Sequence, residues 1–192
     1  MTVPESSAHT PGHSAQSALA SVPALSPTSG DDRELRLTFR EFLSGITVVS
    51  AAAGGRLHAM TANAFCSVSL DPPQVLVCVA HSARFHTAIT TAGCWAVSIL
   101  AADQAAVAAR FATSGRDLAG QFDGIGHVVG EHTGGALLNG ALAWLECRTV
   151  SATEAGDHTV VVGEVLATGV NSAGGPPLAY HRGGYGVTAP TT

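Results

Sequence analysis

Residues 60–73 read Met60-Thr61-Ala62-Asn63-Ala64-Phe65-Cys66-Ser67-Val68-Ser69-Leu70-Asp71-Pro72-Pro73. Short side chains in this stretch leave peptide N–H groups accessible. Thr61, Asn63, Ser67 and Ser69 add polar groups that can hold a phosphate, a polyhydroxyl chain or the edge of a ring. The Asp-Pro-Pro end stops the strand, because proline has no N–H to donate to a neighbouring strand. The stretch therefore predicts a strand and a turn that bind a polar ligand.

The sequence on either side of this stretch contains mostly strand-like patterns. Leu35, Phe39, Phe42 and Leu43 fall on one face of an amphipathic helix expected over residues 31–43, which should pack against another surface. Further helices are expected over residues 84–92 and 103–111, and strands over residues 46–50, 57–65, 74–80, 94–100, 140–150 and 158–166. Many antiparallel strands without regular strand–helix alternation predict a mainly β fold, a closed or nearly closed barrel with a few flanking helices.

Length and charge restrict the class of protein. A chain of 192 residues suits one domain. Residues 1–30, rich in Ser, Ala, Pro and Thr, are expected to form a disordered tail, which leaves residues 31–188 as the folded domain. The net charge of −5 and the lack of a basic run exclude nucleic acid and membrane as expected partners. Charged residues make up only 12%, so part of the surface is expected to be hidden in an oligomer.

Several common chemistries are excluded by what the chain lacks. None of its nine cationic side chains is a lysine, which removes Schiff-base catalysis and the P-loop. The glycines of Gly124-Ile125-Gly126-His127-Val128-Val129-Gly130 have the wrong spacing for a dinucleotide fingerprint. The nine histidines show no metal-ligand spacing, so no metal is expected. The four cysteines form no Cys-x-x-Cys pair and indicate buried, reduced thiols in a cytoplasmic protein.

The sequence Gly156-Asp157-His158-Thr159 places an imidazole at the start of a strand, directly after a tight turn. Asp157 can fix the tautomer of His158, and Gly156 permits a sharp turn. This arrangement suits a histidine that contacts a ligand. A histidine that is merely solvated in the turn is the alternative.

Several segments, in this order along the chain, resemble the flavin reductase family, the small NAD(P)H:flavin oxidoreductases that feed two-component monooxygenases. They are Gly45–Val49, Met60–Pro73, Val75–Val79, Val97–Leu100, Arg110–Ala112, Leu145–Cys147, Gly156–His158, Gly163–Val165, Pro177–Tyr180 and Gly184-Tyr185. The resemblance covers roughly residues 39–185. It implies a split β-barrel of the FMN-binding type that forms a homodimer and binds FMN or FAD without covalent attachment. It also implies reduction of the flavin by NADH or NADPH and its release to a partner monooxygenase.

The resemblance also implies two groups of site residues. The flavin-side group is expected to contact the ring, the ribityl chain or the phosphate, and comprises Thr47, Val48, Thr61, Ala62, Asn63, Ser67, Val68, Ser69, Ser82 and Arg84. The nicotinamide-side group comprises His158, Tyr180, His181, Arg182 and Tyr185. His158 is the catalytic candidate, with a positioning role, because the two cofactors already supply the hydride chemistry. For Arg84, Tyr180 and Tyr185, ordinary surface or edge positions are the alternative.

Two departures from the family pattern and two other functions bear on these expectations. Ala64 and Cys66 stand where many members carry Ser and Thr, which predicts fewer hydrogen bonds in that turn and weaker flavin binding. A flavin-binding barrel that stores or senses the cofactor without turnover would bind flavin but leave NAD(P)H unoxidised. A pyridoxamine-phosphate-oxidase-like enzyme would be expected to carry more basic phosphate ligands than this lysine-free chain offers.

Overall fold

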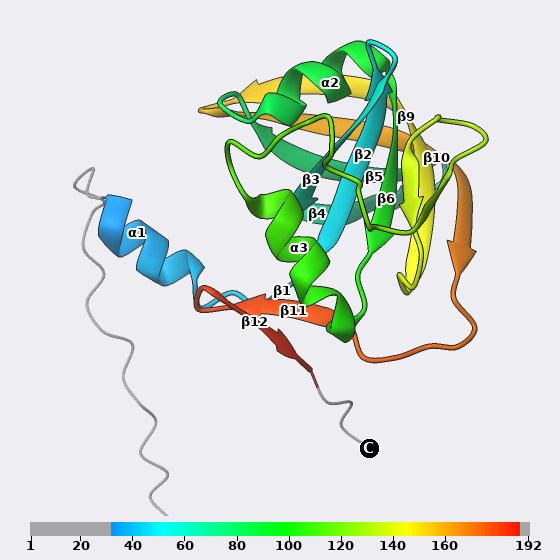
Figure 1. Ribbon diagram of the computed structural model, residues 1–192. Helices are drawn as coiled ribbons and strands as arrows, with labels where there is room; N and C mark the ends of the chain where they lie inside the picture. The colour runs from blue at the N-terminus through cyan, green and yellow to red at the C-terminus, as the bar shows by residue number, and fades with distance from the viewer. Residues whose placement is uncertain (1–31, 189–192) are drawn as a thin grey trace, which may run out of the picture.

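The computed structural model describes residues 32–188, and the expected N-terminal tail lies outside this range. Antiparallel strands dominate the described part of the chain (Figure 1). The helical elements are α1 (Asp32–Phe39), α2 (Arg84–Ala92), the 3-10 turn η1 (Ala102–Gln104) and α3 (Ala105–Ala112). The strands are β1 (Ser44–Gly45), β2 (Thr47–Ala53), β3 (Arg56–Ala62), β4 (Phe65–Leu70), β5 (Pro73–Ala80), β6 (Cys94–Ile99), β7 (His127–Val129), β8 (Ala136–Leu138), β9 (Ala143–Ala155), β10 (His158–Val170), β11 (Leu178–His181) and β12 (Gly184–Val187).

The main sheet has seven antiparallel strands in the order β3-β2-β6-β9-β10-β5-β4. Its outer strands, β3 and β4, do not pair with each other, so the barrel stays open along one side. Two smaller sheets, β1-β11-β12 and β7-β8, complete the fold. The expectation of a mainly β fold with a few helices is confirmed, and the open sheet agrees with a split barrel rather than a closed one.

Both faces of β2, the neighbour of β3 in the main sheet, are covered by buried side chains. Val48 and Val49 point to opposite faces, as successive strand residues must, yet both are fully buried. Val49 packs in a cluster with Trp95, and Val48 packs in a second cluster with Phe111 of α3. Helix α2 contacts β2 and helix α3 contacts β3, so both helices lie against this edge of the main sheet (Figure 1).

The sequence located most elements, with two differences in extent. The strand expected over residues 57–65 is broken at Asn63-Ala64, and from Phe65 the chain pairs with β5 instead of extending β3. The strands around Gly156 are longer than expected, so only Gly156 and Asp157 remain in the turn. Gly156 adopts a φ of 64°, which glycine reaches without strain.

Helix α1 stands away from the sheets in Figure 1 and ends at Phe39, four residues earlier than expected. Asp31, the first residue of the expected helix, lies outside the described residues. The apolar side chains of this segment are exposed, so the surface against which it was expected to pack is not present within residues 32–188. No helix in that range is long and apolar enough to cross a membrane.

The cysteines are less uniformly buried than expected. Cys147 is fully buried, and burial is the main cause that raises the pKa of its thiol to about 12. Cys78 and Cys94 are half-buried, and Cys66 is exposed, which corrects the expectation of burial at that position. All four are free thiols, as expected.

Candidate active site

A cavity of about 350 Å³ opens between β3, the start of α2 and the loop that follows α3. Arg84 and Arg116 lie in its wall and no acidic residue does, so it is termed the cationic pocket. The lining comes from three segments that are distant in the sequence, residues 58–61, residues 82–85, and residues 111–116 with Leu118. Thr61, Ser82 and Arg84 of the predicted flavin-side group meet in this pocket.

Positive charge accumulates in the cationic pocket. Burial lowers the pKa of the Arg116 guanidinium, and the nearby charges of Arg84 and Arg110 lower it further. The Nε atom of Arg116 is buried and has no hydrogen-bond partner. No side chain caps α2, and the N–H of His86 donates to the carbonyl oxygen of Ala83, so the N–H groups of Arg84 and Phe85 remain available at the same wall. The pocket therefore suits an anion, and phosphate is the anion that arginine and helix N-termini bind best together.

Arg116 holds the loop after α3 against the sheet. Its Nη1 donates to the carbonyl oxygens of Phe111 and Thr113, at 2.9 and 3.0 Å. Its Nη2 donates to the carbonyl oxygen of Ala59 on β3 and to Oε1 of Gln121. Sequence reasoning missed Arg116, because the contact with Ala59 joins residues 57 positions apart. The available signal was an arginine in a polar loop directly after the family-like segment Arg110–Ala112.

Three predicted flavin-side residues lie inside the fold. Thr47, Val48 and Ala62 are only 4%, 0% and 6% exposed. The hydroxyl of Thr47 donates to the carbonyl oxygen of Ala62 at 2.9 Å, which ties β2 to the end of β3. These side chains pack inside the fold next to the strand that lines the pocket. Their contact with a flavin stays a prediction.

Thr61 and Asn63 are more accessible. Thr61 is half-buried in the wall of the cationic pocket, and its hydroxyl donates to the carbonyl oxygen of Ala108 at 2.6 Å. That bond joins β3 to α3. Asn63 is exposed in the short connection from β3 to β4. Both can meet a ligand that extends from the cationic pocket past the end of β3.

Ser67, Val68 and Ser69 lie on β4, at the other edge of the main sheet, and do not line the cationic pocket. A register shift interrupts the pairing with β5 between Ser67 and Ser69. The hydroxyl of Ser69 accepts a hydrogen bond from the N–H of Asp71 at 3.2 Å. Their role in flavin binding therefore stays a prediction.

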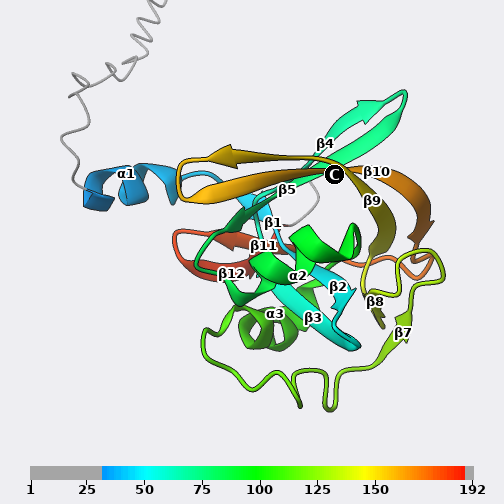
Figure 2. The same ribbon diagram turned by 90° about the horizontal axis from the view of Figure 1, so that it is seen from above.

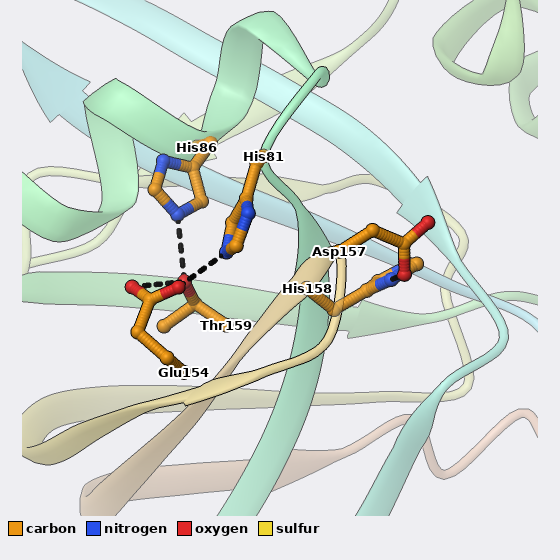
Figure 3. A network of polar contacts seen from close by, with 6 residues as sticks. All are labelled: His81, His86, Glu154, Asp157, His158 and Thr159. Atoms are coloured by element: carbon orange, nitrogen blue, oxygen red, sulfur yellow. Dashed lines mark hydrogen bonds and ion pairs between the residues drawn. The ribbon is translucent and has the colours of Figure 1, made fainter.

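His158 begins β10 beside the turn that the sequence predicted. Its Nδ1 lies 2.7 Å from Oδ1 of Asp157, and this hydrogen bond is the main cause that lowers the pKa of the Asp157 carboxyl (Figure 3). The geometry is the one in which a carboxylate fixes a histidine tautomer. The other ring nitrogen stays available for a ligand, since the side chain is 43% exposed.

A polar network connects the hairpin of β9 and β10, which carries Asp157 and His158, to the cationic pocket (Figure 3). His81 Nε2 lies 2.7 Å from Glu154 Oε2, and its backbone N–H donates to the carbonyl oxygen of Asp157 at 2.9 Å. His86 Nε2 lies 2.8 Å from the hydroxyl of Thr159. The two histidines flank residues 82–85, so they fix the segment that carries Ser82 and Arg84. The sequence did not reveal this role, because His81 and His86 match no motif.

The remaining nicotinamide-side residues form a separate group on β11, β12 and the turn between them, at the bottom of Figure 1. The rings of Tyr180 and Tyr185 lie 5.6 Å apart, and His181 and Tyr185 border a cavity of about 310 Å³. Arg182 pairs with Glu41, with Nη2 2.5 Å from Oε2, and this hydrogen bond is the main cause that lowers the pKa of Glu41. The fold thus places His158 on a different sheet from the other four residues.

Within residues 32–188, no group of three His, Cys, Asp or Glu side chains is arranged to hold a metal ion. The polar chemistry of the described residues is concentrated instead in the arginines of the cationic pocket and in the histidine network beside it.

Comparison with known proteins agrees with this geometry. The "NADH-dependent FAD reductase" of Streptomyces globisporus is 44% identical over 137 residues, which cover 71% of this chain and 75% of the relative. "FMN reductase (NADH) SmoA" of Agrobacterium fabrum is 39% identical over 160 residues, 83% of this chain and 88% of the relative. The crystal structure of BorF, the flavin reductase component of a bacterial two-component tryptophan halogenase, superposes with a TM-score of 0.78. The two sequences are 42% identical, and the superposition covers 84% of this chain and all of the BorF chain.

The model of the flavin reductase like domain matches residues 39–189, most of the chain and all of the elements that build the cationic pocket. Together with the relatives above, this match shows that the chain belongs to the flavin reductase family.

Proposed function

We propose that this protein transfers a hydride from NADH or NADPH to free FMN or FAD. One proton from solvent completes the reaction, which yields oxidised nicotinamide and a reduced flavin that is then released. The observation that carries the proposal is the cationic pocket, a phosphate-type site with uncompensated arginines in a chain of the flavin reductase family. The named relatives include both FAD and FMN reductases, and both depend on NADH.

The residues of the cationic pocket would hold the phosphate end of the flavin. Arg84 and Arg116 supply charge, Ser82 supplies a hydroxyl, and the first turn of α2 supplies N–H groups. The unpartnered Nε of Arg116 fits this role, because a buried donor without a partner is costly and a phosphate oxygen would satisfy it. The ribityl chain and ring would then extend along Thr61 toward Asn63.

Flavin and nicotinamide supply the hydride chemistry themselves. The protein's contribution is to hold the two rings in contact and to keep water away from them. The Asp157–His158 pair is suited to position the nicotinamide, since Asp157 fixes the ring of His158 and leaves one nitrogen accessible. The contacts of His81 and His86 would hold this pair at a fixed position relative to the phosphate site.

Replacing His158 with alanine is expected to raise the KM for NADH about fivefold, because it removes one hydrogen bond worth about 1 kcal/mol. The KM for flavin should change less than twofold. Steady-state kinetics with each substrate varied in turn would measure both values. The matched control is His132→Ala, an exposed histidine on another loop, which should change neither KM. Equal changes in the two KM values for His158→Ala would contradict the assignment.

The direct test of the function is the oxidation of NADH and of NADPH by the purified protein, with FMN and FAD supplied separately. Rapid loss of nicotinamide absorbance that requires added flavin supports the proposal and identifies the preferred substrates. Tight flavin binding without nicotinamide oxidation would instead establish a storage or sensor protein. Repeating the reaction without oxygen should stop it after one equivalent of flavin, since no acceptor then reoxidises the product.

We further propose that the reduced flavin passes to a separate flavin-dependent monooxygenase. Support comes from BorF, the flavin reductase component of a two-component tryptophan halogenase, and from the reductase component of a nitrophenol monooxygenase of Rhodococcus opacus. A site that binds the phosphate end of the flavin and is open to solvent at Asn63 would allow the flavin to leave after reduction.

We also infer that the protein forms a homodimer in which a second copy covers the apolar side chains around α1. These side chains are 40–78% exposed: Leu35 40%, Leu37 50%, Phe39 66%, Phe42 78% and Leu43 49%. Together they form an apolar patch of the kind that marks an interface. We expect Phe42→Asp to shift the protein from dimer to monomer in analytical ultracentrifugation, because a charge would be buried without a partner. Leu70→Asp, at an even more exposed apolar position on β4, is the control.

A further inference from the structure

A second cavity, of about 410 Å³, opens directly beside the cationic pocket and is termed the outer cavity. Leu118 lines both cavities. Strand β3 also runs through both, since residues 58–61 line the cationic pocket and Arg56 and Leu57 line the outer cavity. The two cavities therefore lie next to each other along β3 and are together termed the trough.

The outer wall of this trough is held in place by specific contacts. Strand β3 is an edge strand, so one side of its backbone has no neighbouring strand. The carbonyl oxygen of Leu57 accepts from Gln121 Nε2 at 2.8 Å, and that of Ala59 accepts from Arg116. Gln121 is only 2% exposed. The connection from α3 to β7, which Figure 2 shows passing beside β3, is thus attached to the strand on both sides of the boundary between the cavities.

The lining of the outer cavity suits a flat heteroaromatic ring. Leu57, Leu118 and Phe122 provide apolar surface, and Arg56 provides a cation at the solvent side. The ring of Phe122 is fixed by Phe111 and His127, with ring centroids 5.1 and 4.8 Å away. Aromatic rings held in this way stack well with nucleobases, whatever the base.

We infer that the outer cavity takes the adenosine end of FAD, so that FAD rather than FMN is the preferred flavin; this inference rests on the proposed function. FMN ends at its phosphate and would leave the outer cavity empty. Thr61 and Leu57 are four positions apart on β3, and strand geometry makes that distance about 13 Å. A dinucleotide laid along β3 places its ring end beyond Thr61, its phosphates beside Arg84 and Arg116, and its adenine beside Leu57 and Phe122.

The adenosine diphosphate group occurs in NADH as well as in FAD. Proximity to the phosphate pocket favours FAD, because Leu118 and β3 border both cavities. The test must nevertheless separate the two sources of the same chemical group.

The test is the affinity for FAD and FMN, measured by flavin fluorescence without nicotinamide. The wild type should bind FAD about tenfold more tightly than FMN, as one stacked base predicts. Ala119→Trp would fill the outer cavity from an exposed loop position, and it should weaken FAD binding about tenfold while FMN binding changes less than twofold. Phe122→Leu should weaken FAD binding selectively by removing the stacking ring. Ala106→Trp, an exposed alanine on α3 outside both linings, is the matched control.

Equal wild-type affinities for FAD and FMN would overturn the inference, as would equal weakening of both flavins by Ala119→Trp. A rise in the KM for NADH in this variant, with either flavin and with unchanged FAD affinity, would assign the outer cavity to the nicotinamide dinucleotide and also overturn it. Selective FAD binding without NADH or NADPH oxidation would support the outer cavity and contradict the proposed reductase function. The two failures are therefore distinguishable.

Discussion

Replacing Arg116 with alanine is expected to raise the KM for flavin about 100-fold. The change removes a cation from the cationic pocket and leaves the carbonyl oxygens of Phe111, Thr113 and Ala59 without their donor. Hydrogen bonds to a charged group contribute about 1.5–3 kcal/mol each, so a loss of about 2–3 kcal/mol in flavin binding is expected after the loop relaxes. Flavin titration and steady-state kinetics with the flavin varied would both measure it.

The control for this prediction is Arg148→Ala. Arg148 is another partly exposed arginine, but it lies on β9 and pairs with Glu164 at 2.6 Å, away from the cationic pocket. Its loss should leave the KM for flavin within twofold. Arg116→Lys should recover part of the affinity, since it restores the charge but not the fork of donors. An Arg116→Ala protein that binds flavin normally while remaining folded would remove the cationic pocket from the mechanism.

Replacing Gly163 with alanine is expected to lower the free energy of unfolding by about 3 kcal/mol. A Cβ at this position would lie 2.5 Å from Cζ2 of Trp95 and 3.0 Å from Cβ of Cys147. Trp95 is fully buried, and its indole Nε1 donates to the hydroxyl of Thr149 at 3.2 Å, so the ring cannot move aside freely. Overpacking of a tight core costs about 1–3 kcal/mol, and this contact is among the closest in the sheet. Urea denaturation followed by tryptophan fluorescence would measure the change.

Gly169→Ala is the matched control, because it lies on the same strand and its Cβ would make an ordinary contact, 3.6 Å from Trp144. Its effect should stay within about 0.5 kcal/mol. Trp95→Phe should be less damaging in the Gly163→Ala background than in the wild type, because the smaller ring makes room for the added methyl group. Additive effects of the two changes would show that the contact with Trp95 is not the cause.

The sequence predicted those elements of the fold that have a clear local pattern. The bounds of α2, Arg84–Ala92, agree with the expectation, because a clear apolar periodicity ends at Gly93, whose φ of 69° terminates the helix. The break at Asn63-Ala64 was not predicted, since the apolar and polar alternation continues through it and only the pairing with β5 reveals it. Local sequence indicates an element but not its partner strand.

The candidate site shows the same limit. Thr61, Ser82 and Arg84 were predicted from family-like motifs, and the fold brings them into one pocket. Arg116 and the histidines of the network were missed, because the contacts of Arg116 with Ala59 and of His86 with Thr159 join positions 57 and 73 residues apart, and no local pattern encodes them. Conversely, the family resemblance implies one group of nicotinamide-side residues, yet the fold places His158 on the main sheet and the other residues on or beside the sheet β1-β11-β12.

The loop that closes the trough along β3 has a consequence for the protein in solution. An uncovered edge strand offers its N–H and C=O groups to strands of other molecules, which is a common route to aggregation. Arg116 and Gln121 occupy two of these carbonyl groups on β3. The loop that borders the binding site therefore also keeps the sheet from growing by a further strand. Selection against aggregation would then preserve this loop even in a relative that no longer binds flavin.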